Sequence, residues 1–274
     1  MTFRRLFRNK GAVLGALLAT TFLAIGLVGP VLAPKNPGTQ RLDRVLTPPG
    51  AEFILGTDHL GRDVLSRLFY AGRNSFLIGI GAVAVGLGIG APLGLTTGFF
   101  GGLADTIAMR VVDVMLSFPG ILLALAIISA LGPGLGNVVL AVGISSIPIY
   151  ARIVRGTVLR LRGLEFIVAA EALGAGPARI LAVHLLRNCL GPIVVQTSLR
   201  FAEAIIIGSG LSFLGLGVPP AVPEWGSMLA DGRGYLRSAP WVAVFPGLCL
   251  MIAVLGFNLV GDGLRDALDP RLRA

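Results

Sequence analysis

Long apolar stretches recur along the chain, and they constrain its fold more strongly than any other feature. A helix needs roughly 20 mostly apolar residues to cross the hydrocarbon core of a bilayer. Six stretches approach or exceed that length: residues 11 to 33, 75 to 98, 107 to 131, 137 to 151, 189 to 214 and 241 to 261. This pattern predicts an all-α, polytopic membrane protein with about six transmembrane helices. A membrane β-barrel would instead show short segments of alternating hydrophobicity.

The composition excludes a soluble domain as the main body of the chain. Hydrophobic residues make up 54% of the sequence and charged residues 14%, and the mean hydropathy is +0.84. The net charge of +9 raises the question of nucleic acid. The basic residues, however, lie in short blocks beside apolar stretches, without interleaved aromatic residues. We therefore expect membrane lipid, and no nucleic acid, as a partner.

Basic residues also predict the orientation of the spans. Arg4, Arg5, Arg8 and Lys10 precede the first stretch. A cleaved signal peptide is the alternative, but its apolar region is normally about 7–15 residues, so we expect a retained helix. Cytoplasmic N- and C-termini place most basic residues inside, as the positive-inside rule requires. The outer connection, residues 34 to 73, also carries basic residues, which acidic residues partly offset.

Glycine and proline mark special positions within the apolar stretches. The second stretch carries Gly86, Gly90, Gly94 and Gly98. This four-residue spacing gathers small residues on one helix face, so we expect close helix packing within the subunit or against a sister subunit. Prolines are expected to interrupt the spans and free backbone groups, which at membrane depth lie against protein or a water-filled cavity. They are Pro92, Pro119, Pro148 and Pro192.

The sequence carries no signature of catalysis or of nucleotide binding. A phosphate-binding loop needs lysine after a glycine-rich turn, whereas Lys10 and Lys35 follow asparagine and proline. We expect no catalytic residues, no metal site and no cofactor in this chain. His59 and His184 are expected to be solvated or hydrogen-bonded. Two cysteines, Cys189 and Cys249, are expected to be packing residues.

One ionisable pair is predicted inside the membrane. Arg200 and Glu203 lie three residues apart in the fifth stretch, close enough on a helix to pair. A functional role and a structural intrahelical pair are both consistent with this spacing. An ion-coupled secondary transporter, which would need such intramembrane carboxylates, is an alternative class of function. A purely structural membrane subunit is another.

The segment from Gly163 to Leu190 is polar enough to leave the membrane and keeps a helical pattern. A short amphipathic helix is predicted from Leu164 to Leu173, with Ile167, Ala170 and Leu173 or Gly174 at helical spacing. Gly174, Gly176 and Pro177 are expected to end it. Such a helix offers a knob for a partner's groove. A membrane-surface helix is the alternative, and Glu165 and Glu171 argue against it.

The outer connection contains a compact motif of turn-forming and charged residues. Its members are Gly56, Thr57, Asp58, Gly61, Arg62 and Asp63. The two glycines permit tight turns. Asp58 and Asp63 are expected to accept charge-assisted hydrogen bonds from Arg62 and Arg67. A structural loop is the favoured interpretation, and direct contact with a substrate or a binding protein is the alternative.

Five motifs together resemble the inner-membrane components of binding-protein-dependent ABC importers, and within them the C-type permease of the dipeptide, oligopeptide and nickel group. They are LGTDHLGRDVLSR at residues 55 to 67, DVMLSFP at 113 to 119, AAEALGA at 169 to 175, LSFLGLG at 211 to 217 and FNLVGDGLRDALDPR at 257 to 271. The resemblance covers nearly the whole chain. It implies a type I ABC importer transmembrane fold in the bacterial inner membrane, with residues 1 to 73 as an N-terminal segment and 74 to 274 as the core transmembrane domain.

The resemblance also implies a mechanism and partners. The amphipathic segment looks like a coupling helix that docks into a cytoplasmic ATPase, with ATPase-coupling residues Glu165, Ala169, Ala170, Glu171, Ala172, Leu173 and Gly174. The implied partners are a B-type permease, two ATPase subunits that bind ATP and Mg, and an extracytoplasmic substrate-binding protein. Import of di- or oligopeptides by alternating access is expected. Nickel chelates and glutathione are alternative substrates.

Three positions depart from the family pattern. Val168 and Arg187 stand where relatives usually carry glutamate and proline, and both lie on the docking segment. Either the partner ATPase has adjusted, or Glu165 or Glu171 supplies the acidic contact. Gly208 stands where many relatives have glutamate, which puts in doubt any gating or substrate role at that position; Glu203 is a candidate to compensate.

Overall fold

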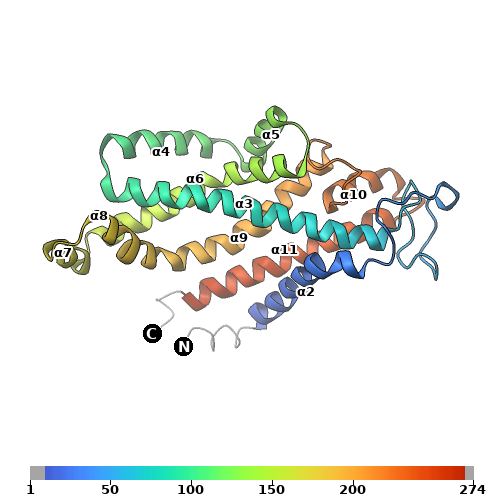
Figure 1. Cartoon of the computed structure of the whole chain (residues 1–274), viewed down its shortest axis with the longest axis horizontal. Helices are drawn as coiled ribbons and strands as arrows, with labels where there is room; N and C mark the ends of the chain where they lie inside the picture. Colours follow the sequence, from blue (N-terminus) through green and yellow to red (C-terminus); the bar gives the residue numbers. More distant parts are fainter. Residues whose placement is uncertain (1–9, 269–274) are drawn as a thin grey trace.

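The structure is a computed structural model that describes residues 10 to 268, and every regular element in that range is helical (Figure 1). The longer helices are α2 (Lys10–Leu32), α3 (Val64–Phe100), α4 (Gly102–Ser117), α5 (Gly120–Leu131), α6 (Leu135–Arg162), α9 (Leu186–Phe213) and α11 (Trp241–Leu268). The shorter elements are η1 (Leu42–Arg44), α7 (Glu165–Ala172), α8 (Pro177–Arg179), the π-helical segment η2 (Ile180–Leu185), α10 (Trp225–Gly232) and η3 (Arg233–Tyr235).

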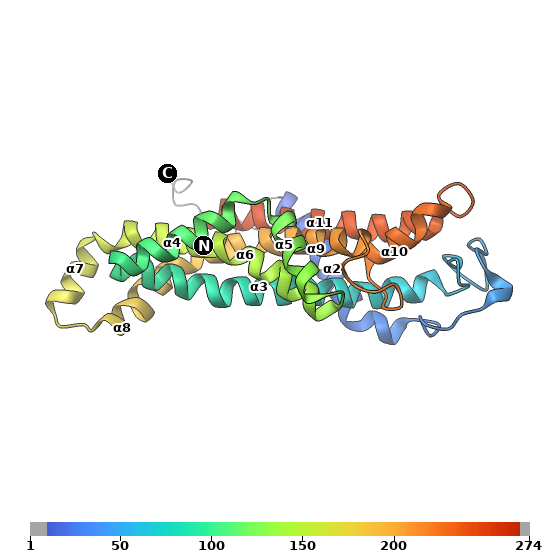
Figure 2. The same cartoon turned by 90° about the horizontal axis from the view of Figure 1, so that it is seen from above.

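The helices form an elongated bundle that is narrow in its third dimension (Figures 1 and 2). Helix α7 lies at one end of the long axis, and the connection between α2 and α3 lies with α10 at the other. Helices α3, α6 and α9 run through the middle. Helices α4 and α5 lie along one edge against α6, and α2 and α11 pack together on the other side. Helix α7 and the α2–α3 connection are therefore separated by the length of the bundle.

The glycine stripe explains why α3 and α6 pack so closely. A Cβ atom on Gly90 would lie 2.5 Å from the carbonyl oxygen of Ile147, and one on Gly94 would lie 2.4 Å from that of Ala151. Both distances are too short for a side chain, so only glycine allows the two backbones to meet here. The expected packing role is confirmed, and the contact lies within this subunit.

The long-helix count agrees with the predicted fold. Within residues 10 to 268, five helices are long and apolar enough to cross a membrane, and α4 with α5 makes a sixth if the bent pair counts as one span. The prediction of an all-α membrane protein with about six spans is therefore confirmed. The helices extend beyond the apolar stretches, since α3 begins at Val64 rather than near residue 75, and α6 continues to Arg162.

The third predicted span is not a straight helix. Residues 107 to 131 divide between α4 and α5, which meet at an angle of 97°. Phe118 adopts an extended conformation and Pro119 follows it, so the backbone leaves the helix where a residue before proline disfavours the α conformation. The expectation that four prolines interrupt spans was wrong for the other three, because Pro92, Pro148 and Pro192 lie inside continuous helices.

The predicted division of the chain at residue 73 stays a prediction. Helix α3 runs through that position without a break. The basic cluster Arg4, Arg5 and Arg8 and the final residues of the C-terminal motif, 269 to 271, lie outside the described residues.

Candidate functional site

Helix α7 is held in place by a single buried side chain and a well-formed end. Ile167 is fully buried and packs in a cluster that includes Val158, Ile180 and Leu185. At the end of the helix the amide of Ala175 donates to the carbonyl of Ala170 and that of Gly174 to Glu171. These two bonds are those of a Schellman motif, in which the residue past the helix end adopts a positive φ. Gly174 has φ +83° and meets that need.

The rest of α7 and its C-cap face outward, and no described residue covers their apolar side chains. Phe166 and Val168 are exposed, and Leu173 is 89% exposed. The predicted buried stripe is therefore limited to Ile167 and the half-buried Ala170, and Leu173 does not belong to it.

The structure brings the predicted coupling residues together on one short helix and its end. The exposed ones are Glu165, Ala169, Glu171, Ala172, Leu173 and Gly174. Their coupling role stays a prediction. Arg187, one of the departures from the family pattern, is also exposed and lies just after η2.

At the opposite end, the outer motif encloses a buried charge network. Arg62 Nε donates to Asp58 Oδ2 at 2.6 Å, and Arg67 Nε lies 3.6 Å from the same oxygen. Arg62 Nη2 reaches Asp231 Oδ2 on α10 at 3.4 Å. Both arginines also donate to the carbonyl of Pro220. This network ties the α2–α3 connection to α10 and to the segment before it.

The expected partners of Asp63 were wrong. Its carboxylate accepts hydrogen bonds from the amide and hydroxyl of Ser66 at 2.8 and 2.6 Å, so it caps the N-terminus of α3. Gly56 and Gly61 have φ of +77° and +70°, as the turns require. A Cβ atom on Gly61 would lie 1.8 Å from the carbonyl of Arg41, which leaves room for glycine alone.

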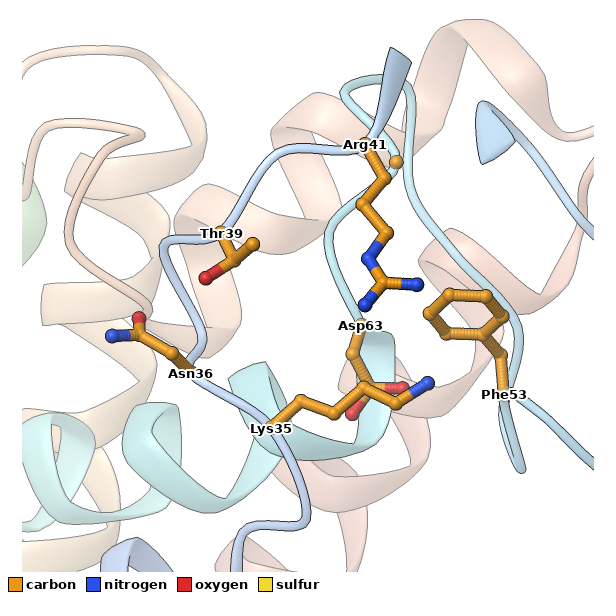
Figure 3. Close-up of a pocket in the computed structure, with 7 residues that line it drawn as sticks. Lys35, Asn36, Thr39, Arg41, Phe53 and Asp63 are labelled. Atoms are coloured by element: carbon orange, nitrogen blue, oxygen red, sulfur yellow. The ribbon is translucent and has the colours of Figure 1, made fainter. Parts of the chain in front are cut away.

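A polar pocket of about 140 Å³ lies beside the motif (Figure 3). Figure 3 shows Lys35 and Arg41 reaching toward Phe53 across the pocket. Lys35 Nζ lies 3.4 Å from the centre of the Phe53 ring, and Arg41 Nη1 pairs with Glu52 at 3.3 Å. The two cations at this pocket therefore have partners within the loop.

Sequence reasoning missed Glu224, the most deeply buried carboxylate near the outer end. It is fully buried and caps α10, since its Oε2 accepts from the amide of Ser227 at 2.9 Å. Its Oε1 accepts from Ser209 on α9 at 2.7 Å and from Ser75 on α3 at 3.3 Å. One side chain thus joins three helices. Glutamate is not among the preferred N-cap residues, so the local sequence carries no signal for this role.

His59 and Asp231 lie together at this end. The imidazole of His59 stacks on the Tyr235 ring with 5.7 Å between centroids, and no hydrogen-bond partner for its buried Nδ1 lies in the part of the chain that the structure describes. Burial raises the pKa of Asp231 above its ordinary value, while His59, Arg62 and Arg67 act in the opposite direction.

Within the membrane region, Arg200 and Glu203 pair as predicted. Arg200 Nη1 lies 2.6 Å from Glu203 Oε2. Both side chains line a cavity of about 130 Å³ beside the break between α4 and α5. Gly208 lies further along α9, and a Cβ atom there would lie 2.6 Å from Ile78 Cγ2. The position is therefore closed to a larger side chain as the helices stand.

Among residues 10 to 268, no group of three or more His, Cys, Asp and Glu side chains is arranged to hold a metal ion. Cys189 is buried in the cluster beneath α7, in line with the packing role expected for it, and Cys249 is half-buried. His184 is half-buried in η2.

Two known families match the chain. Residues 90–274 match the binding-protein-dependent transport system inner membrane component, and residues 1–49 match the N-terminal TM domain of oligopeptide transport permease C. Among curated relatives, the di/tripeptide transport system permease protein DppC of Pseudomonas aeruginosa is 46% identical, over 97% of this chain and 89% of the relative. The glutathione transport system permease protein GsiD of Pectobacterium atrosepticum is 45% identical, over 99% and 91%.

A solved structure shares the fold. The MetNI methionine ABC transporter in inward-facing conformations aligns with a TM-score of 0.55 and 21% identity, over 75% of this chain and 96% of the matched chain. At this level of identity the likeness concerns the fold, which agrees with the type I importer architecture expected from the motifs.

Proposed function

The chain belongs to the family of binding-protein-dependent transport system inner membrane components, and from this premise we propose that it carries di- and oligopeptides into the cell with energy from partner ATPases. Its family and its helical membrane fold make it a permease component of an ABC importer in the inner membrane. The predicted resemblance is thereby confirmed. The substrate, the partners and the path of coupling are the parts that we propose.

The exposed helix α7 carries the proposal of ATP coupling. Its apolar side chains Phe166, Val168 and Leu173 face outward, although the Schellman motif and Ile167 hold the helix firmly. An ordered helix with uncovered apolar side chains is the form that fits a partner's groove. We assign this groove to a cytoplasmic ATPase subunit. ATP and Mg bind to the ATPase subunits and not to this chain. The α7 end of the bundle and both termini are then cytoplasmic.

The peptide substrate is inferred from the relatives and tested against two alternatives. The di/tripeptide permease and the dipeptide permeases match nearly the whole chain, as does a glutathione permease. Glutathione is itself a small peptide, so its import would extend the proposal. Nickel chelates are the other alternative.

Alternating access follows from partner binding. A second, B-type permease completes the pathway, and a binding protein delivers substrate at the outer end. ATP-loaded subunits bind the inward-open and outward-open forms with different affinity, and this difference shifts the population between them.

For the outer motif we propose a structural role, because Asp58, Arg62 and Asp63 form their hydrogen bonds within the loop and with its neighbours. We keep residues 1 to 73 as an N-terminal segment and 74 to 274 as the core domain.

Uptake into proteoliposomes tests the proposal. The chain is reconstituted with its second permease, ATPase subunits and binding protein, and labelled dipeptide, glutathione and a nickel chelate are supplied in turn. We expect dipeptide uptake to require ATP on the side of the membrane where the ATPase subunits lie. Uptake that needs no ATP and follows an ion gradient would contradict it and favour a secondary transporter.

A further inference from the structure

A charged cavity lies where the bent span meets the middle of α9. Its volume is about 130 Å³, and its walls include Phe118 and Gly120 at the break, Ile149 on α6, and Arg200 and Glu203 on α9. The last two are the ionisable residues among those that line it. Residues on both sides of the break line the cavity, with Met115 and Leu116 on α4 and Leu123 on α5.

The ion pair in this cavity joins no second helix. Arg200 and Glu203 both lie on α9, three residues apart, with 2.6 Å between Nη1 and Oε2. By contrast, Arg155 on α6 forms two hydrogen bonds to Asp105 on α4 and so links two elements. Charges at membrane depth are costly and usually face a pathway or a partner. An intrahelical pair does not repay that cost through packing, so a different use is indicated.

The pair also retains unused hydrogen-bonding capacity. Among the described residues, no hydrogen-bond partner lies at the buried Nε of Arg200, and the Glu203 side chain, which lines the cavity, is 41% exposed. A guanidinium binds a carboxylate best through two parallel N–H donors, of which Nε is normally one. In the paired state Nε is closed to a ligand, so it becomes a donor only when the pair opens. A second, weaker polar contact lies nearby, where the Tyr150 hydroxyl lies 3.3 Å from that of Thr197. The site is therefore polar and incompletely satisfied.

We propose that Arg200 and Glu203 form a subsite for the charged end groups of the transported peptide. The guanidinium of Arg200 binds the terminal carboxylate, and the carboxylate of Glu203 binds the terminal ammonium. This inference rests on the proposed peptide import and names how the chain recognises that substrate class. Side chains three residues apart on a helix have Cβ atoms about 5–6 Å apart. The ends of a dipeptide are separated by a similar length, about 3.3–3.6 Å for each residue.

Exchange of partners makes such a subsite suitable for transport. Without substrate, the two side chains neutralise each other. A zwitterionic peptide brings one charge of each sign, so the pair opens and every charge keeps a partner. Net binding is then weak, which lets substrate leave. A peptide with one blocked end would leave either Arg200 or Glu203 unpaired at membrane depth, where an uncompensated charge is strongly unfavourable. The subsite reads only what free peptides share.

Thiol protection tests the subsite without the binding protein. The complex carries Ile149→Cys, which places a thiol in the cavity wall. The half-buried Cys249 is replaced by alanine so that it does not react, and Cys189 is kept because it is fully buried. Millimolar alanyl-alanine is expected to slow labelling of the introduced thiol severalfold. Its C-terminal amide and its N-acetyl form are expected to need at least about tenfold higher concentrations for the same protection. Equal protection by all three forms would overturn the proposal.

Substitutions then separate binding from structure. Arg200→Gln and Glu203→Gln are expected to lower ATP-driven uptake of alanyl-alanine about tenfold. The double variant Arg200→Gln/Glu203→Gln leaves no lone charge, so it is expected to assemble but to lose the preference for free ends. Arg152→Gln, which removes an exposed pair with Asp113 outside the cavity, is the matched control and should change uptake less than about twofold.

The outcomes distinguish this subsite from the transport function. If the native complex imports alanyl-alanine and both single variants import it equally well, the subsite is wrong and peptide import stands. If the double variant fails to assemble, the pair is structural and the subsite is again overturned. If the native complex imports no peptide, the proposed function fails, and selective protection by the free dipeptide alone would still support the subsite.

Discussion

Arg62 Nε donates a hydrogen bond of 2.6 Å to Asp58 Oδ2, and both side chains are only 4% exposed. Removing one partner of a buried pair leaves an uncompensated charge, which costs about 3–5 kcal/mol. Asp58→Asn is therefore expected to lower the thermal unfolding temperature of the detergent-solubilised protein clearly. Glu52→Gln, which breaks exposed pairs with Arg41 and Arg44, is the control and should cost less than about 1 kcal/mol. Equal shifts for the two variants would contradict the role of the buried pair.

The carboxylate of Glu224 is expected to hold three helices together. Glu224→Ala removes the acceptor for Ser75, Ser209 and the amide of Ser227. An unsatisfied buried donor costs about 1–3 kcal/mol, so the variant should be severely destabilised. Glu224→Gln keeps an acceptor oxygen, so its thermal unfolding temperature should lie between those of the native protein and of Glu224→Ala. A Glu224→Ala variant as stable as the native protein would show that the three donors find other partners.

Two glycines on α3 provide a matched test of helix packing. A Cβ atom on Gly90 would meet the carbonyl of Ile147 at 2.5 Å and Tyr150 Cβ at 2.7 Å. A Cβ atom on Gly88 would have no neighbouring atom of the described residues within 4 Å outside its own helix backbone. Gly90→Ala is expected to destabilise the protein by roughly 1–3 kcal/mol through overpacking. Gly88→Ala is expected to be neutral or stabilising by about 0.5–1 kcal/mol, because alanine favours the helix. Similar unfolding temperatures for both variants would contradict the close contact of α3 with α6.

Asp231 predicts a pH dependence of stability. Burial raises the pKa of its carboxyl in the folded protein. Above the unfolded pKa of about 3.9, the folded state therefore holds a proton that the unfolded state has released. Stability then falls as the pH rises through this window. Asp231→Asn does not titrate, so the native protein should lose stability relative to this variant as the pH rises above about 4.

Thermal unfolding of both proteins across pH 4 to 7 measures this difference. Asp231 also reaches Arg62 at 3.4 Å, and this contact favours the ionised carboxylate, so it opposes the effect of burial on the pKa of Asp231. A native protein that gains stability relative to Asp231→Asn as the pH rises would show that the nearby cations outweigh burial.

Much of the fold could be predicted because it depends on local sequence. Apolar stretches predicted the long helices, the spacing of Gly86 to Gly98 predicted that α3 packs closely against another helix, and Gly174 predicted the end of α7. Each of these signals lies within a few helical turns. The break at Pro119 was predicted from the proline, but its sharp angle was not, since apolar character continues on both sides and gives no direction.

The site residues that were missed depend on partners distant in sequence. Glu224 is held by Ser75 and Ser209, and Arg62 reaches Asp231 across the outer end. Asp63 could accept hydrogen bonds from a nearby arginine or from Ser66, and in the structure its carboxylate accepts from Ser66. The cavity at Arg200 and Glu203 is lined by four helices, so the spacing of the pair predicted the contact but not its surroundings.

ATP-driven import through this chain depends most directly on the contact between α7 and an ATPase, and coupled uptake tests that contact. ATP-driven uptake of labelled dipeptide and ATP hydrolysis are measured in the same proteoliposomes, for the native complex, for Leu173→Asp and for the apolar control Leu173→Met. Leu173 is 89% exposed, so neither change should disturb the fold of this chain. We expect native uptake with Leu173→Met, and for Leu173→Asp a loss of uptake of about tenfold or more. Full ATP-driven uptake by Leu173→Asp would contradict the docking role of α7, and ATP-independent uptake by the native complex would contradict the importer itself.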